Sequence, residues 1–122
     1  MRVTSRFVQK VWGEEEWLIN TSLYCGKVLY LNPGWQCSLH YHREKDETFH
    51  ILAGEVMLEV WTGGQVEFIH MKYMDTYNLP PQTPHRFWSI SGPAEILEIS
   101  TTHSDDDVVR VEDSCRRDPH GS

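Results

Sequence analysis

Apolar and polar residues alternate over short stretches along most of the chain, and turn residues separate one stretch from the next. Alternation with a period of two is typical of strands, whose successive side chains point to opposite faces, whereas a helical period is nearly absent. The alternation is most regular over 55–61, and the TGGQ segment at 62–65 predicts a hairpin into a strand at 66–70. Further strands are expected at 27–31, 35–42, 47–52, 85–90 and 95–100.

Short strands at nearly even spacing, joined by turns that contain glycine or proline, predict an all-β fold of the sandwich or barrel type. The segment 12–18 fits either a helix or a strand that begins after Gly13. We expect a single domain over 1–117, because the chain has no internal repeat and no linker. Residues 118–122 are expected to form a polar C-terminal tail.

Composition narrows the class of protein. With 122 residues, of which 39% are hydrophobic, the chain can bury a core and is not of the disordered type. Its net charge of −7 argues against a nucleic-acid partner, since neutralising phosphates requires a basic face. Because no apolar run has the length of a membrane span and the N-terminus lacks a signal-peptide pattern, we expect a cytoplasmic protein without a membrane partner. The three scattered cysteines are expected to be free thiols, in agreement with that compartment.

Three histidines and one glutamate form the strongest candidate site. His40 and His42 stand two apart on an expected strand, so both imidazoles point to the same face. A turn then brings Glu47 back on the next strand, and His85 begins a later strand after a proline-rich loop. Three neutral imidazoles and one carboxylate suit one divalent transition metal, which could be Zn, Mn, Fe, Co or Ni, with positions left open for substrate. The histidines expected not to bind the ion are His50, His70, His103 and His120.

The spacing of these candidate ligands, framed by Gly34 and Gly54, is G-x5-HxH-x4-E-x6-G. This is the first motif of the cupins, and the chain resembles that superfamily. The resemblance implies a small antiparallel double-stranded β-helix, also called a jelly-roll barrel, with the three histidines and the glutamate as its metal ligands.

The second cupin motif, G-x5-P-x-G-x2-H-x3-N, is only partly kept. Pro80 and His85 are present, whereas Met74, Gln82 and Ser89 replace the two glycines and the asparagine. The replaced positions are expected to serve turn geometry rather than ligation, so the departure concerns the shape of the loop more than the metal.

Both ends of the chain carry a more specific resemblance. The KxWG pattern at 10–13 and the DDDVVRVEDS segment at 105–114 are similar to the cupin domain of type II mannose-6-phosphate isomerases and of related sugar isomerases, including D-lyxose isomerases. The lyxose isomerases have the pattern HxHxxKxE, which 40–47 reproduces, whereas mannose-6-phosphate isomerases often have Gln in place of His40. The resemblance implies a metal-dependent aldose–ketose isomerase or epimerase that acts on a sugar or a sugar phosphate.

Such a reaction needs a Lewis acid at the carbonyl and hydroxyl oxygens, together with a group that moves a proton unless a hydride shifts directly. Lys45, whose pKa the nearby ion would lower, is a candidate acid or base, and the alternative for it is a solvated turn residue. Glu47 is a second candidate base, a role that competes with ligation. Arg110 would hold a substrate hydroxyl or phosphate, or would pair with the acidic run at 105–107 in a strand that closes the barrel.

Two other functions stay open, a non-catalytic sugar-binding cupin and an Fe(II) dioxygenase-type cupin. The expected partner is in each case a small molecule, with a slight preference for a neutral sugar because Asp and Glu number 18 against 11 Lys and Arg. A homodimer is also expected, since an open barrel edge favours pairing with a second copy.

Overall fold

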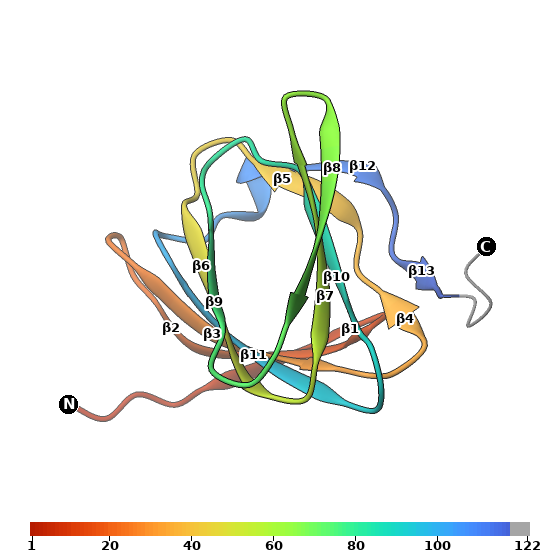
Figure 1. The fold of residues 1–122 in the computed structure, drawn as a ribbon. Coiled ribbons are helices and arrows are strands. Elements are labelled where there is room, and N and C mark those ends of the chain that lie inside the picture. Colours follow the sequence, from red (N-terminus) through yellow and green to blue (C-terminus); the bar gives the residue numbers. More distant parts are fainter. Residues whose placement is uncertain (118–122) are drawn as a thin grey trace.

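The structure, a computed structural model, describes residues 1–117 as two antiparallel sheets that face each other and enclose the interior of a small barrel (Figure 1). The all-β fold expected from the sequence is therefore confirmed. The tail at 118–122, which includes His120, lies outside the described residues. Within the described part of the chain, no helix has the length and apolar character needed to cross a membrane.

Sheet A has six strands in the order β1-β2-β3-β11-β6-β9, and sheet B has seven, in which β7 pairs with both β10 and β8 while the rest follow the order β12-β5-β10-β4-β13. The strands of sheet A are β1 (Arg6–Lys10), β2 (Gly13–Asn20), β3 (Cys25–Leu31), β11 (Ala94–Ser100), β6 (Glu47–Ala53) and β9 (Thr76–Leu79). Those of sheet B are β4 (Trp35–Gln36), β5 (Leu39–His42), β7 (Val56–Thr62), β8 (Gln65–Met71), β10 (His85–Ser89), β12 (Val108–Glu112) and β13 (Cys115–Arg116), and one 3-10 turn, η1 (Asp105–Asp107), precedes β12.

Every segment expected to be a strand contains one, and the segment 35–42 is divided into β4 and β5. The ambiguous segment 12–18 is extended, because β2 begins at Gly13 and pairs along its length with β3. Gly13 has a φ of 155°, and a side chain there would collide with the carbonyl oxygen of Tyr30. The strands β1 and β9 escaped prediction, since each is short and mostly exposed and pairs with a single neighbour at a sheet edge.

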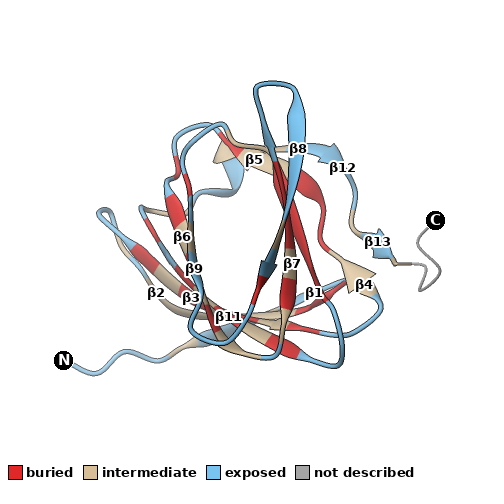
Figure 2. Ribbon diagram, viewed as in Figure 1, coloured by how far each residue is buried: buried red, intermediate tan, exposed pale blue. Residues whose placement is uncertain are grey.

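The hydrophobic core fills one end of the space between the sheets. Ile51, Leu58 and Ile96 have no exposed surface, and the ring of Phe87 packs edge-on against Trp12 at 5.2 Å between ring centres. Figure 2 shows the buried stretches on the strands that face this space, whereas the protruding β7–β8 hairpin is exposed at its tip. The other end of the interior holds the polar side chains of the candidate site.

The two residues that replace the glycines of the second cupin motif keep the backbone conformation of glycine. Met74 has a φ of 74° and Gln82 a φ of 64°, and among the described residues they are the non-glycine residues with positive φ. The turn geometry expected at these positions is thus present, although a side chain in the left-handed region costs about 1–2 kcal/mol. The proline loop before β10 therefore has its shape without the motif's glycine.

Candidate metal centre

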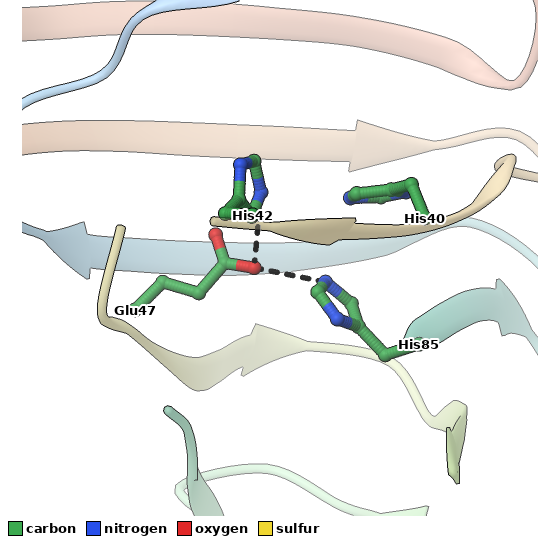
Figure 3. A group of neighbouring side chains, drawn as sticks. All are labelled: His40, His42, Glu47 and His85. Atoms are coloured by element: carbon green, nitrogen blue, oxygen red, sulfur yellow. Dashed lines mark ion pairs between the residues drawn. The ribbon is translucent and has the colours of Figure 1, made fainter. Parts of the chain in front are cut away.

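Three strands bring the four candidate ligands together. His40 and His42 alternate on β5, His85 opens β10 directly across from His40, and Glu47 opens β6. One possible ligand atom from each side chain lies within 4.8 Å of those of the others. Figure 3 shows the Glu47 carboxylate pointing between the rings of His42 and His85, with His40 beside them. The spacing in the sequence thus anticipates which side chains meet.

The atoms at the centre of this group lack hydrogen-bond partners. Glu47 Oε1 lies 2.8 Å from His85 Nε2 and 3.5 Å from His42 Nε2. Although these atoms lie close together, neither Glu47 Oε1 nor His85 Nε2 forms a hydrogen bond, and both are buried. Leaving such atoms unpaired is costly unless another group binds them. The donor set and its orphaned atoms fit a divalent transition metal ion.

Backbone carbonyls fix the orientation of two of the imidazoles. His40 Nδ1 lies 2.8 Å from the carbonyl oxygen of Ser38, and His85 Nδ1 lies 2.8 Å from that of Thr83. Each Nδ1 is therefore the protonated nitrogen that donates, so Nε2 carries the lone pair toward the centre. A second hydrogen bond of this kind is usual for metal-binding histidines.

The protonation states favour a cation at the centre. Burial, followed by the nearby imidazole of His85, lowers the pKa of His40 to about 3, so its ring is neutral at pH 7. Although burial disfavours the charged form of Glu47, the close rings of His42 and His85 and the charge of Lys45 outweigh it and hold the pKa of Glu47 well below its usual range. Burial also opposes the charged form of His85, but the adjacent Glu47 carboxylate prevails and raises the pKa of His85. The Glu47 carboxylate thus favours positive charge next to His85 Nε2, which is the charge that a bound metal ion would supply.

Lys45 is a buried residue of the site rather than a solvated turn residue. Its Nζ donates to Glu98 Oε2 at 2.6 Å and lies 3.5 Å from Glu47 Oε2 and 3.2 Å from His103 Nδ1. Burial lowers the pKa of Lys45, but the carboxylates of Glu98 and Glu47 outweigh burial and raise it. Glu98 and Glu47 thus raise the pKa of Lys45, whereas a bound metal ion is expected to lower it.

The acidic run holds the turn that carries Lys45. The Asp107 carboxylate accepts hydrogen bonds from the backbone N–H groups of Glu44 and Lys45, at 2.9 and 3.0 Å. Arg110 lies on β12 opposite His40, as expected for a strand that closes the barrel. The expected pairing of Arg110 with the acidic run does not occur: within residues 1–117 its exposed side chain has no acidic partner within 4 Å.

Two residues of the site were not anticipated as such. Glu98 points inward from β11 and binds Lys45, and its place among apolar inward positions of that strand was an available signal. His103 lies between Lys45 and Asp105, whose Oδ1 is 2.8 Å from His103 Nε2. Burial, together with the charges of Lys27 and Lys45, lowers the pKa of His103 to about 4, so the ring is neutral at pH 7. No sequence spacing links His103 to the turn it meets.

A cavity of about 800 Å³ opens beside these groups. Its lining includes His40, His42, Lys45, Glu47, His103 and Arg110. Three of the four candidate ligands and Lys45 thus face the same space, while His85 is buried behind them. A part of the wall that contains Glu15 and Lys27 lies on β2 and β3.

The three cysteines are free, as expected. Cys37 lines the cavity but is buried, and the Phe87 N–H donates to its sulfur at 3.2 Å. Burial raises the pKa of Cys37 to about 12, despite the opposing effect of that hydrogen bond. The thiol therefore stays protonated, and thiolate ligation by Cys37 is not favoured.

Comparison with known proteins places this geometry in a family. The model of the cupin domain family matches residues 27–100. Among solved structures, oxalate decarboxylase from Bacillus subtilis is similar with a TM-score of 0.79 and 16% identity, over 88% of this chain and 30% of that chain. The oxalate decarboxylase of Lactobacillus farciminis, in a formate complex, is similar with a TM-score of 0.77 and 16% identity, over 88% of this chain and 34% of that chain.

These structural matches show a shared fold, and this chain spans about a third of the length of either enzyme. The family match covers the segment from Lys27, near the start of β3, to the end of β11, which includes all four candidate ligands. The fold, the matched segment and the His/Glu cluster agree. This chain belongs to the cupin domain family.

Proposed function

We propose that this protein is a metal-dependent aldose–ketose isomerase or epimerase that acts on a sugar or a sugar phosphate. The observation that carries the proposal is the position of Lys45, which is buried 3.5 Å from the candidate ligand Glu47 and faces the same cavity as His40, His42 and Glu47. An ion held by His40, His42, Glu47 and His85 would supply Lewis acidity to a carbonyl oxygen.

Lys45 supplies a proton donor beside that position. Glu98 and Glu47 keep Lys45 protonated, so Nζ would donate to the carbonyl oxygen while Glu47 Oε2, 3.5 Å away, takes the proton from the adjacent substrate carbon. His103 is neutral and in contact with Lys45, which makes its ring a local acceptor when a proton has to leave Nζ.

Glu47 and Arg110 have distinct roles in this proposal. Oε1 of Glu47 faces the histidines and Oε2 faces Lys45, so one carboxylate can bind the ion and also contact the proton donor. Arg110 lines the cavity without an acidic partner among the described residues, which leaves its guanidinium available to a substrate hydroxyl.

Turnover assays test the proposal. Protein loaded in turn with Mn²⁺, Fe²⁺, Co²⁺, Ni²⁺ or Zn²⁺ would be assayed for interconversion of aldoses and ketoses, free and phosphorylated. We expect turnover that is lost on chelation and reduced by at least about 100-fold in Lys45→Met, the loss typical of a general acid or base. Lys72→Met, in an exposed turn, is the matched control and should retain activity.

Other outcomes of the same assays favour the other candidates. Sugar binding without turnover in any metal form would favour a non-catalytic binding module. Oxygen consumption by the Fe²⁺ form would favour a dioxygenase, a class compatible with three histidines and one glutamate. The homodimer and the cytoplasmic location expected from the sequence stay predictions.

A further inference from the structure

A second group of charged side chains lies in the wall of the cavity, outside the candidate ligand set. Lys27 points inward from β3 and is 2% exposed. Its Nζ lies 3.4 Å from Glu15 Oε1 and 4.1 Å from the centre of the Trp17 ring. The Trp17 indole N–H donates to the same Glu15 oxygen at 2.9 Å, which fixes the carboxylate in place.

Lys27 has fewer partners than its burial requires. An ammonium group has three N–H donors, and within residues 1–117 the one hydrogen-bond acceptor of Lys27 is Glu15, at 3.4 Å. Lys45, equally buried, has contacts with Glu98, Glu47 and His103. Buried polar groups are nearly always satisfied, so the spare donors of Lys27 indicate a ligand oxygen in the cavity.

The register of sheet A places Lys27 within reach of a molecule bound at the metal cluster. Lys27 pairs with Glu98 across β3 and β11, and Ser100, two residues farther along β11, pairs with Glu47 on β6. With strands about 4.8 Å apart and a rise of about 3.3 Å per residue, the Cα atoms of Lys27 and Glu47 are about 12 Å apart. Both side chains extend into the cavity, so a small sugar can contact both.

We propose that Lys27 and Glu15 bind hydroxyl groups at the end of the substrate remote from the metal, and thereby select a neutral sugar over its phosphate. The proposal rests on the function proposed above. Lys27 donates to one hydroxyl oxygen and Glu15 accepts from another. A phosphate would instead meet the Glu15 carboxylate, and the second buried lysine of the cavity is already paired with Glu98.

Binding measurements on the Mn²⁺-loaded protein test this inference. The probes are D-mannose, D-fructose and D-ribose, each compared by calorimetry with its own terminal phosphate. We expect at least one neutral sugar to bind at least about 10-fold more tightly than its phosphate, and Lys27→Met to lose about 10-fold or more in affinity for that sugar. Lys72→Met is the control, and metal content and thermal midpoint are measured for every variant.

A second variant covers the case in which Lys27→Met does not fold. Glu15→Gln keeps the shape of the pair but removes the negative charge, so it should improve binding of the phosphate relative to the sugar by about 10-fold. Tighter binding of every phosphate by the wild type, no binding of any probe, or an unchanged ratio in Glu15→Gln would each overturn the inference. So would wild-type affinity in a folded Lys27→Met protein.

Turnover on the same samples separates this inference from the proposed function. Sugar binding that depends on Lys27 without any turnover would remove the isomerase and leave the binding site. Turnover that prefers phosphates, and that Lys27→Met does not change, would remove the binding site and leave the isomerase.

Discussion

Three neighbouring strands of sheet A change the character of their inward side chains part of the way along, and this divides the barrel interior into two halves. On β3 and β11 the inward pair Lys27 and Glu98 is followed, two residues along, by the pair Leu29 and Ile96. On β6 the inward residue Glu47 stands at the polar end of the same strand that carries Ile51. Sheet A thus contributes residues to both the core and the site.

The two halves of the interior differ in their effect on stability as well as in composition. The apolar half gains stability from each buried methylene, whereas the polar half buries ionisable groups, some of them without hydrogen-bond partners. Buried polar groups without hydrogen-bond partners lower the stability of the folded protein until a ligand or an ion binds them. The apolar half therefore stabilises a barrel whose other half is kept polar for binding, a division typical of functional sites.

The largest expected effect comes from the apolar half. Leu58→Ala removes a side chain with no exposed surface, and we expect a loss of about 2–5 kcal/mol in the free energy of unfolding. Ser100→Ala, in the polar half, removes a hydroxyl that donates to the Thr101 carbonyl and should cost about 1 kcal/mol. Urea unfolding of the metal-free proteins measures both. Equal losses would contradict the division into two halves.

Addition of a metal is expected to act through the polar half. At a free ion concentration of about 100 Kd, binding should add about 2.7 kcal/mol and raise the thermal midpoint by about 10 °C. Calorimetric scans with and without a chelator measure the shift. Leu58→Ala should keep the shift and His42→Ala should lose it; the reverse pattern would place the ion outside the cluster.

The sequence predicts the parts of the site that depend on residues close together in the chain better than those that depend on distant residues. The alternation at 40–42 and the turn before Glu47 are local, and they correctly indicate which side chains share a face. Glu98 and His103 reach Lys45 from 53 and 58 residues away in the chain, through long-range packing that no local pattern encodes. Local alternation puts Lys27 on the same face as Leu29, but its place in the wall of the cavity depends on long-range packing.

The pH dependence of stability should report on His103. Because burial and its cationic neighbours hold the pKa of His103 near 4, against 6.5 as its ordinary value, the unfolded chain takes up a proton in this range before the folded protein does. The wild type should therefore lose stability relative to His103→Gln as the pH falls from 6.5 to 4. Urea unfolding of metal-free protein across that range measures the gap, and a constant gap would count against a buried neutral imidazole.

The smallest expected effects come from the two strained turns, one at each end of the barrel. Met74 N–H donates to the Ile51 carbonyl in the apolar half, and Gln82 N–H donates to the His42 carbonyl beside the site. Met74→Gly and Gln82→Gly should each raise the free energy of unfolding by up to about 1 kcal/mol, since glycine adopts positive φ without strain but loses more entropy on folding. If urea unfolding shows that both glycine variants are less stable than the wild type, the backbones of Met74 and Gln82 are not strained.

The central claim is that the polar half holds a divalent transition metal, and metal titration tests it most directly. Metal-free wild-type protein would be titrated with Mn²⁺, Fe²⁺, Co²⁺, Ni²⁺ and Zn²⁺ by calorimetry, beside Glu47→Gln and the exposed-histidine control His70→Gln. We predict a stoichiometry of about one ion per chain for wild type and His70→Gln, and a loss of at least about 100-fold in affinity for Glu47→Gln. Absence of binding of all five ions by the folded wild-type protein would contradict the account.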